Sequence, residues 1–222
     1  VFVSRWLGGS IINGDASSLE FRVAGLLSNC PEVKRALEEK IDIHTHTRET
    51  MDKGGHVWKA KDPDPKKELK ARRDEAKSRT FKPLFGGTSG TDAERAWFQR
   101  FLEWFSGVDS WQHKLADDAL KFKEIYSPSG RIYAFPYCKR FPSGKVANFT
   151  QICNYPVQGF GFDIIMLTML ELWREFRRNE IVYSRIIMNV HDSVVIDAHP
   201  EEYDLVVKLF RQVVERMPQV LI

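Results

Sequence analysis

We predict an α+β fold in which an antiparallel β-sheet is joined to a mostly helical segment. Residues 186–190 and 194–197 are two runs rich in Ile and Val, separated by a short polar step, which indicates a buried β-hairpin. Between residues 31 and 118, apolar residues recur at helical spacing and the breaks fall at Gly and Pro, which indicates helices. With 222 residues, 43% of them hydrophobic, the chain can bury a core of useful size.

The composition excludes several classes of protein. The three cysteines, Cys30, Cys138 and Cys153, are odd in number and lack metal-site spacing, so the sequence supports neither a disulfide framework nor a zinc site. No apolar run reaches the roughly 20 residues of a membrane span, and no signal peptide is visible. We therefore expect a cytoplasmic protein with no membrane partner.

Two acidic residues stand beside the predicted strands. Asp192 lies in the polar step of the hairpin, and Asp15 follows strand-like sequence at residues 1–6 and 10–13, just before a helical pattern that starts near Ser17. A carboxylate fixed beside a buried sheet is unfavourable unless it is hydrogen-bonded or binds a cation. The hypothesis is that Asp15 and Asp192 meet and hold divalent metal; a turn or capping role is the alternative for Asp15.

Helices are predicted from Pro31 onward, and the segment 66–85 is the most informative. Arg73, Lys77, Phe81 and Phe85 are four residues apart and form one stripe. Two cations and two rings suit a nucleoside triphosphate, because cations bind phosphates and rings bind the base and sugar. The window 59–82 holds ten Lys or Arg against five Asp or Glu, which fits a phosphate partner, although such runs are often only a solvated face.

The remainder of the chain alternates helices with short strands. Further helices are predicted at 93–105 and 108–125, followed by a strand over 131–135. The run 159–176 is a strongly apolar helix that should lie under a sheet, and 201–217 is a final amphipathic helix.

Taken together, five motifs in order make the chain resemble the family A DNA polymerases, the DNA polymerase I type. Residues 15–22 read DASSLEFR, similar to the family's Asp-Tyr-Ser-Gln-Ile-Glu-Leu-Arg, and residues 42–45 read DIHT. The stripe from Arg73 fits Arg-x3-Lys-x3-Phe-x3-Tyr-Gly, and residues 154–159 read NYPVQG. Residues 190–192 read VHD, like the start of the family's Val-His-Asp-Glu hairpin.

The resemblance implies a role for each matching residue. Two Mg²⁺ ions would be held by Asp15, Asp192 and the carbonyl of Ala16. The triphosphate would be bound by Arg73, Lys77 and His44, with Lys77 able to give a proton to pyrophosphate. The incoming sugar and base would be contacted by Phe81, Phe85 and Glu20, with Glu20 excluding ribonucleotides. The primer-template would be contacted by Asn154, Gln158, His191 and, at its backbone, Arg131.

Several positions depart from the family pattern, and two of them adjoin the proposed metal and sugar sites. Ser193 stands where the family usually has Glu, which leaves Asp15 and Asp192 as the carboxylate pair. Phe85 replaces the usual Tyr, so a hydrogen bond from that hydroxyl to Glu20 is absent, and looser sugar discrimination or changed fidelity is expected. Neither change removes an element that two-metal chemistry requires.

The expected architecture is a polymerase palm formed by residues 1–29 and 152–222, with fingers and connecting elements at 30–151. The expected function is template-directed addition of deoxynucleotides to a DNA primer. The family's thumb and exonuclease domains are expected on a partner chain or fragment. Divergence of the motifs suggests a bacteriophage or viral origin, hence the host cytoplasm.

Two other classes of function stay open from the sequence. A non-catalytic DNA-binding subunit that works only with a partner chain would not need the metal carboxylates and Lys77. A two-metal nuclease would not need the stripe from Arg73 to Phe85.

Overall fold

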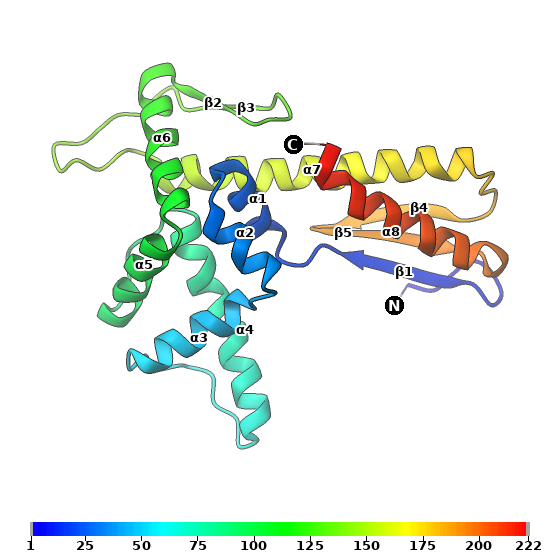
Figure 1. Ribbon diagram of the computed structural model, residues 1–222, viewed down its shortest axis with the longest axis horizontal. Helices are drawn as coiled ribbons and strands as arrows, with labels where there is room; N and C mark the ends of the chain where they lie inside the picture. Colours follow the sequence, from blue (N-terminus) through cyan, green and yellow to red (C-terminus); the bar gives the residue numbers. More distant parts are fainter. Residues whose placement is uncertain (1, 221–222) are drawn as a thin grey trace. The chain divides into compact units, whose positions relative to one another are not determined.

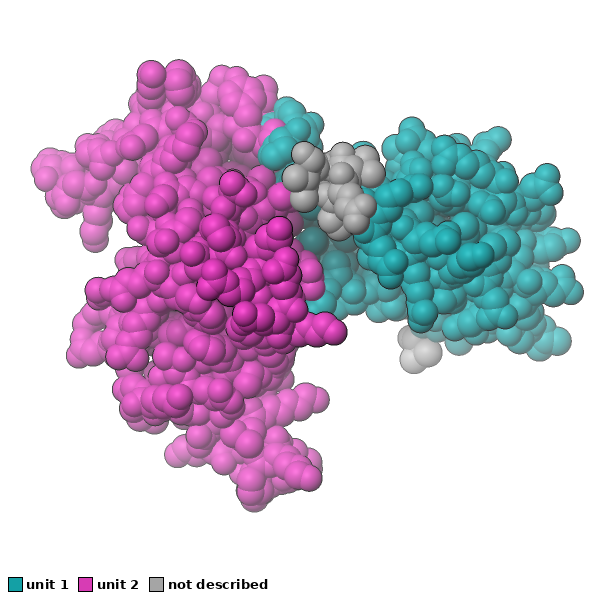
Figure 2. All heavy atoms as spheres, in the orientation of Figure 1, with its two compact units in different colours: residues 1–19, 128–131, 158–222 teal, residues 20–127, 132–157 magenta. Residues whose placement is uncertain are grey.

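The computed structural model describes residues 2–220, which form two compact units. The first unit comprises residues 1–19, 128–131 and 158–222, and the second comprises residues 20–127 and 132–157 (Figure 2). The sequence predicted a palm of residues 1–29 and 152–222. The main parts of the first compact unit are shorter, residues 1–19 and 158–222. Residues 1, 221 and 222 fall within the predicted palm but outside the described residues.

A three-stranded antiparallel sheet forms the centre of the first unit. Its strands are β1 (Ser10–Asp15), β4 (Arg185–Val190) and β5 (Ser193–Ala198), in the order β1-β5-β4 (Figure 1). The predicted hairpin is confirmed as β4 and β5, joined by His191 and Asp192. Every residue of β5 is buried, as expected for a central strand rich in Val and Ile.

Helices α7 (Phe149–Arg178) and α8 (Tyr203–Val220) supply the apolar layer on one face of this sheet. Every second residue of β5 faces this layer, and α7 and α8 add apolar residues at helical spacing. The buried residues of this hydrophobic cluster are Val194, Ile196, Ala198, Ile165, Leu172, Phe176, Val206, Leu209, Val213 and Met217. The prediction of an apolar helix packed on the sheet is confirmed.

The segment preceding β1 was predicted as a strand, and for residues 2–6 this is wrong. Residues of this segment bind the side chain of Asp197 instead of pairing with a neighbouring strand. Ser4 Oγ donates to Asp197 at 2.6 Å, and Arg5 Nε donates to the same carboxylate at 3.0 Å. Asp197 is 4% exposed on β5. Burial disfavours its charged form, but the bonds from Ser4 and Arg5 outweigh this and hold the pKa of Asp197 below its usual value.

The second unit is mostly helical. It contains the helices α1 to α6, of which α1 begins at Leu19, the last residue of the first unit's opening segment. A short antiparallel pair of strands, β2 and β3, follows α6. The elements are α1 (Leu19–Ser28), α2 (Pro31–Glu38), α3 (Ile43–Lys53), α4 (Pro65–Leu84), α5 (Asp92–Trp104), α6 (Ser106–Phe122), β2 (Glu124–Tyr126) and β3 (Ile132–Ala134).

Two predicted boundaries in this part of the chain are wrong. Helix α7 begins at Phe149, ten residues before the predicted start, because Ile152, Cys153 and Val157 are buried at helical spacing despite the intervening Pro156. Helix α6 ends at Phe122 instead of Ile125, because Lys123 adopts a left-handed conformation with φ 62° and closes the helix.

Among residues 2–220, no helix is both long and apolar enough to cross a lipid bilayer.

Gly14, immediately before Asp15, is required by the packing of α8 against β1. A Cβ atom at this position would lie 1.9 Å from a ring carbon of Phe210. We expect Gly14→Ala to lower the free energy of unfolding in urea by about 1–3 kcal/mol, as overpacking does. In a Phe210→Ala background the same change is expected to have little effect, because the clash is gone. An equal loss in both backgrounds would contradict this account.

Candidate active site

The sheet brings Asp15 and Asp192 to the same end of two neighbouring strands. Asp15 is the last residue of β1 and pairs in register with Ser193, the residue after Asp192. Beyond the last pair, the backbone N–H of Ala16 donates to the carbonyl oxygen of Asp192 at 3.1 Å. Asp15 is exposed and Asp192 is half-buried. The backbones of these two acidic residues are thus held side by side by hydrogen bonds.

The turn that carries Asp192 is tight and locally braced. His191 adopts φ 54°, a left-handed conformation that a non-glycine residue seldom takes, in a two-residue connection between β4 and β5. The hydroxyl of Ser193 donates to the carbonyl oxygen of Val190 at 2.9 Å across this turn. Ser193 is 6% exposed, so the residue that replaces the family's Glu serves the turn itself.

The donor atoms at this end of the sheet fit Mg²⁺. Carboxylate and carbonyl oxygens are hard ligands, and Mg²⁺ in phosphate chemistry commonly takes one or two carboxylates and completes its shell with water and substrate phosphates. Among the described residues, no group of three or more His, Cys, Asp or Glu side chains could hold a metal by itself. A pair of carboxylates such as Asp15 and Asp192 suits Mg²⁺ that is bound together with phosphate.

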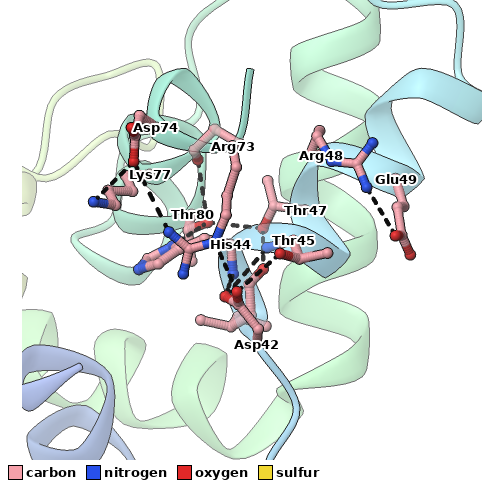
Figure 3. Close-up of polar contacts among 12 residues, drawn as sticks. Asp42, His44, Thr45, Thr47, Arg48, Glu49, Arg73, Asp74, Lys77 and Thr80 are labelled. Carbon is pink, nitrogen blue, oxygen red and sulfur yellow. Dashed lines mark hydrogen bonds and ion pairs between the residues drawn. The ribbon is translucent and has the colours of Figure 1, made fainter. Parts of the chain in front are cut away.

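Helix α4 presents the predicted stripe, and each of its two cations already has an acidic partner (Figure 3). Arg73 Nε donates to Asp42 Oδ2 at 2.7 Å, and Lys77 Nζ lies 3.1 Å from Asp74 Oδ1. Asp42 also caps α3 by accepting from the backbone N–H groups of His44 and Thr45. Burial disfavours the Asp42 carboxylate, but the bonds from Arg73 and Thr45 prevail and hold its pKa well below the usual range.

The aromatic part of the stripe is continuous with His44. The rings of Phe81 and Phe85 are stacked, with centroids 5.8 Å apart and planes 11° from parallel. The His44 ring meets Phe81 edge-on at 5.2 Å. Side chains from α3 and α4 thus form one cation–aromatic surface within the second unit.

His44 is nearly enclosed by this packing. It is 6% exposed, and its Nδ1 lies 3.1 Å from the hydroxyl of Thr80, which in turn contacts the hydroxyl of Thr47 at 2.7 Å (Figure 3). Burial, followed by the positive charge of Arg73, lowers the pKa of His44 to about 4. The ring is therefore neutral near pH 7, so a contact from it to phosphate would be a hydrogen bond from an uncharged donor.

The C-terminal end of α4 is held by a buried amide. Gln112 on α6 is 1% exposed, and its Nε2 donates to the carbonyl oxygens of Pro83 and Leu84 at 2.9 and 2.8 Å. These carbonyls lie in the last turn of α4, where intrahelical donors are missing. Gln112 thereby fixes the end of the helix next to Phe85.

The remaining predicted residues occupy α1, α7 and the loop before β3. Glu20 lies half-buried in the first turn of α1. On α7, Gln158 is exposed and Asn154 is half-buried, with an Oδ1 atom that has no hydrogen-bond partner among the described residues. Arg131 is engaged by Asp163 on α7, which accepts from both its Nε and Nη2. A phosphate contact by Arg131 would have to share or exchange this ion pair.

Sequence reasoning missed the acidic partners of the predicted cations. Asp74 precedes Lys77 by three residues on α4, a spacing that places the two on one helix face and could have revealed the pair. Asp42 and Asp163 are 31 and 32 residues from their arginines, and no local pattern points to these contacts.

The fold is that of a DNA polymerase domain. The structure matches the POL domain of Pol1 from M. smegmatis, solved in complex with DNA primer-template and dNTP, with a TM-score of 0.74. The match covers 93% of this chain and 36% of that one, at 19% sequence identity.

The chain belongs to DNA polymerase family A, whose family profile matches residues 1–221. It is 28% identical over 218 residues to the thermostable DNA polymerase I of Thermus aquaticus, covering 94% of this chain and 25% of the relative. It is 28% identical to DNA polymerase I of Bacillus subtilis (strain 168), covering 95% and 24%, and 27% identical to the chloroplastic DNA polymerase I A of Oryza sativa subsp. japonica, covering 87% and 21%. The chain thus spans a quarter or less of these relatives, and the viral origin stays a prediction.

The low pKa of His44 predicts a measurable dependence of stability on pH. The folded-state pKa is about 4 and the ordinary value is 6.5, so between these limits the unfolded chain binds the proton first. Stability contributed by neutral His44 is therefore complete above pH 6.5 and is lost as the pH falls toward 4. The pKa values of His46 and His56 are lowered in the same direction by burial.

We expect His44→Gln to reduce the slope of the unfolding free energy against pH by up to one proton, or about 1.4 kcal/mol per pH unit, between pH 6 and 4.5. Urea unfolding at intervals of half a pH unit measures this slope, and His113→Gln, an exposed substitution on α6, is the control. An unchanged slope in His44→Gln would show that His44 titrates normally in the folded protein.

Proposed function

We propose that this chain is the catalytic part of a template-directed DNA polymerase that adds deoxynucleotides to the 3′-hydroxyl end of a primer. The observation that carries the proposal is the register of β1 against β5, which sets Asp15 beside Asp192 at the end of a rigid sheet. Membership of DNA polymerase family A across nearly the whole chain supports it. In the family's terms, the first unit would be the palm and the second the fingers.

The metal ligands in this proposal are Asp15, Asp192 and the carbonyl oxygen of Ala16, which would hold two Mg²⁺ ions. When bound, these ions supply activation of the primer hydroxyl and stabilisation of the charge on the leaving pyrophosphate. The pairing of β1 and the turn at His191 support this assignment, because they hold the backbones of Asp15 and Asp192 side by side.

The triphosphate is assigned to the cations of α4 and to His44. The Nε of Arg73 is held by Asp42 and its Nη1 lies 3.9 Å from Asp74, so Nη2 is the group best placed to donate to phosphate. As the primer oxygen bonds to the α-phosphorus, the bond from that phosphorus to the pyrophosphate oxygen breaks. Lys77 is proposed to give a proton from Nζ to the departing pyrophosphate, while His44, uncharged, donates a hydrogen bond.

Recognition of the sugar and base falls to Phe81, Phe85 and Glu20 in this proposal. The stacked rings of Phe81 and Phe85 offer a flat apolar surface at the C-terminal half of α4. Glu20 is assigned to exclude the 2′-hydroxyl of ribonucleotides. Because Phe85 lacks a hydroxyl that could hold Glu20, we propose that this exclusion is weaker here than in relatives with Tyr at the position.

The primer-template is assigned to polar residues of α7 and of the catalytic turn. The buried Oδ1 of Asn154 has no hydrogen-bond partner within the described part of the chain, and the side chains of Gln158 and His191 are exposed, so all three can form hydrogen bonds with nucleic acid. Arg131 would bind backbone phosphate by sharing its ion pair with Asp163. A thumb that grips the duplex, and an exonuclease domain, would come from a further segment or chain, as the family resemblance implies.

Loss of one metal carboxylate should abolish primer extension. We expect Asp192→Asn, which keeps the side-chain shape but removes the charge, to reduce template-dependent extension of a labelled primer at least about 100-fold. Asp204→Asn, on the exposed first turn of α8 in the same unit, is the matched control and should extend primers like the unaltered chain. Equal extension by both variants would refute the assignment of Asp192.

Removal of divalent metal should act on the same step. Chelation with EDTA is expected to stop extension by the unaltered chain, and excess Mg²⁺ to restore it. The assay is repeated with a thumb-bearing polymerase fragment supplied in trans, which should increase extension. Tight binding of primer-template by the chain, with no extension under any of these conditions, would instead identify a non-catalytic DNA-binding subunit.

A further inference from the structure

The two cations assigned to the triphosphate cannot by themselves make α4 attractive to an anion. Arg73 is matched by Asp42 at 2.7 Å and Lys77 by Asp74 at 3.1 Å. Two positive and two negative charges within ion-pair distance leave the surface nearly neutral at a range of several ångströms. A polyanion approaching this part of the helix would meet little net field from these four residues.

The other arginines of α4 are also neutralised. Arg72 pairs with Glu68 at 2.8 Å, and Arg79 pairs with Glu75 and Glu94 at 3.2 and 3.1 Å. The pair with Glu94 joins α4 to α5, and Arg72 also lies 3.9 Å from Asp52 of α3, so these arginines have a structural role. They add no excess positive charge to the outer face.

The excess charge of α4 comes from its lysines, three of which lie in its first two turns and one, Lys82, in its last. Lys66, Lys67 and Lys70 are exposed, and none of them lies within ion-pair distance of a carboxylate among the described side chains, although the charge of Lys70 helps to lower the pKa of Asp74. Lys66 and Lys70 precede Arg73 and Lys77 at intervals of four, three and four residues, which is the spacing of one helix face. Lys67 lies one position further round the helix and off this face.

We propose that Lys66 and Lys70 are the steering site for the polyphosphate of the incoming nucleotide, which they attract and deliver along one face of α4 to Arg73 and Lys77. This inference rests on the proposed function and extends the triphosphate site by two helical turns. The partner chemistry is a flexible chain of phosphates, because the four cations lie in a line and the two at its far end are free to bind.

The test measures binding of inorganic tripolyphosphate to the full chain by calorimetry without divalent metal, so that Asp15 and Asp192 take no part. We expect Lys66→Gln/Lys70→Gln to weaken tripolyphosphate binding about threefold to tenfold at low salt. The control Lys67→Gln/Lys208→Gln removes the same amount of charge, but from a position outside this face of α4 and from α8. It should bind tripolyphosphate like the unaltered chain. At roughly 1 M salt, where the Debye length is about 3 Å, the difference should disappear.

The controls separate this inference from the proposed function. If Arg73→Gln weakens binding but Lys66→Gln/Lys70→Gln behaves like Lys67→Gln/Lys208→Gln, the steering site is refuted and the triphosphate site stands. If Arg73→Gln has no effect, or the unaltered chain binds tripolyphosphate no more tightly than inorganic phosphate, the triphosphate site itself is refuted. Thermal unfolding of each variant tests whether a loss of binding comes from misfolding; loss of Lys66, a cation in the first turn of α4, is not expected to weaken the helix.

A second set of binding measurements tests nucleic acid as the competing partner. Binding of a single-stranded oligonucleotide should respond equally to both double variants, as a general effect of net charge. Selective loss of oligonucleotide binding in Lys66→Gln/Lys70→Gln, with tripolyphosphate binding intact, would assign these lysines to nucleic acid and overturn the proposal.

Discussion

The pairing of β1 with β5 is the constraint on which the candidate active site depends. Opposite residues in this ladder put Asp15 against Ser193, and the bond from Ala16 N–H to the Asp192 carbonyl fixes the strand end. A slip of one residue would turn Asp15 toward the helices and expose Ile12. Phe210 opposes such a slip, because its ring fills the space above Gly14 and leaves no room for a side chain there. Core packing and site geometry therefore enforce the same register.

The two halves of the proposed chemistry are held in physically different ways. The backbones of Asp15 and Asp192 are positioned by hydrogen bonds of the sheet and its end. The guanidinium of Arg73 is positioned by an ion pair with Asp42, a partly exposed contact that can exchange one anion for another. We infer that the sheet provides a fixed point, whereas α4 provides groups that are ordered before the nucleotide arrives and can change partners when it does.

How much the sequence could predict depended on the range of the interactions involved. The hairpin and α4 follow from local periodicity, and both were predicted within a few residues. Residues 2–6 look like a strand locally but fold against the side chain of Asp197, nearly 200 positions away. The pairing of Arg131 with Asp163 is likewise invisible to local patterns. Motifs could identify which residues carry charge, but not which of those charges are already neutralised.

That distinction changes how the charge of α4 should be interpreted. Ten basic residues in the window 59–82 suggest a strongly positive surface. The arginines among them, however, form ion pairs with carboxylates of α4 and α5 and with Asp42, the residue that caps α3. Among the described residues, the lysines near the start of the helix lack such partners, as does Lys82 in its last turn. The attraction of a phosphate chain and its final binding are therefore separable properties of one helix face, the first depending on unpaired charge and the second on ordered, paired cations.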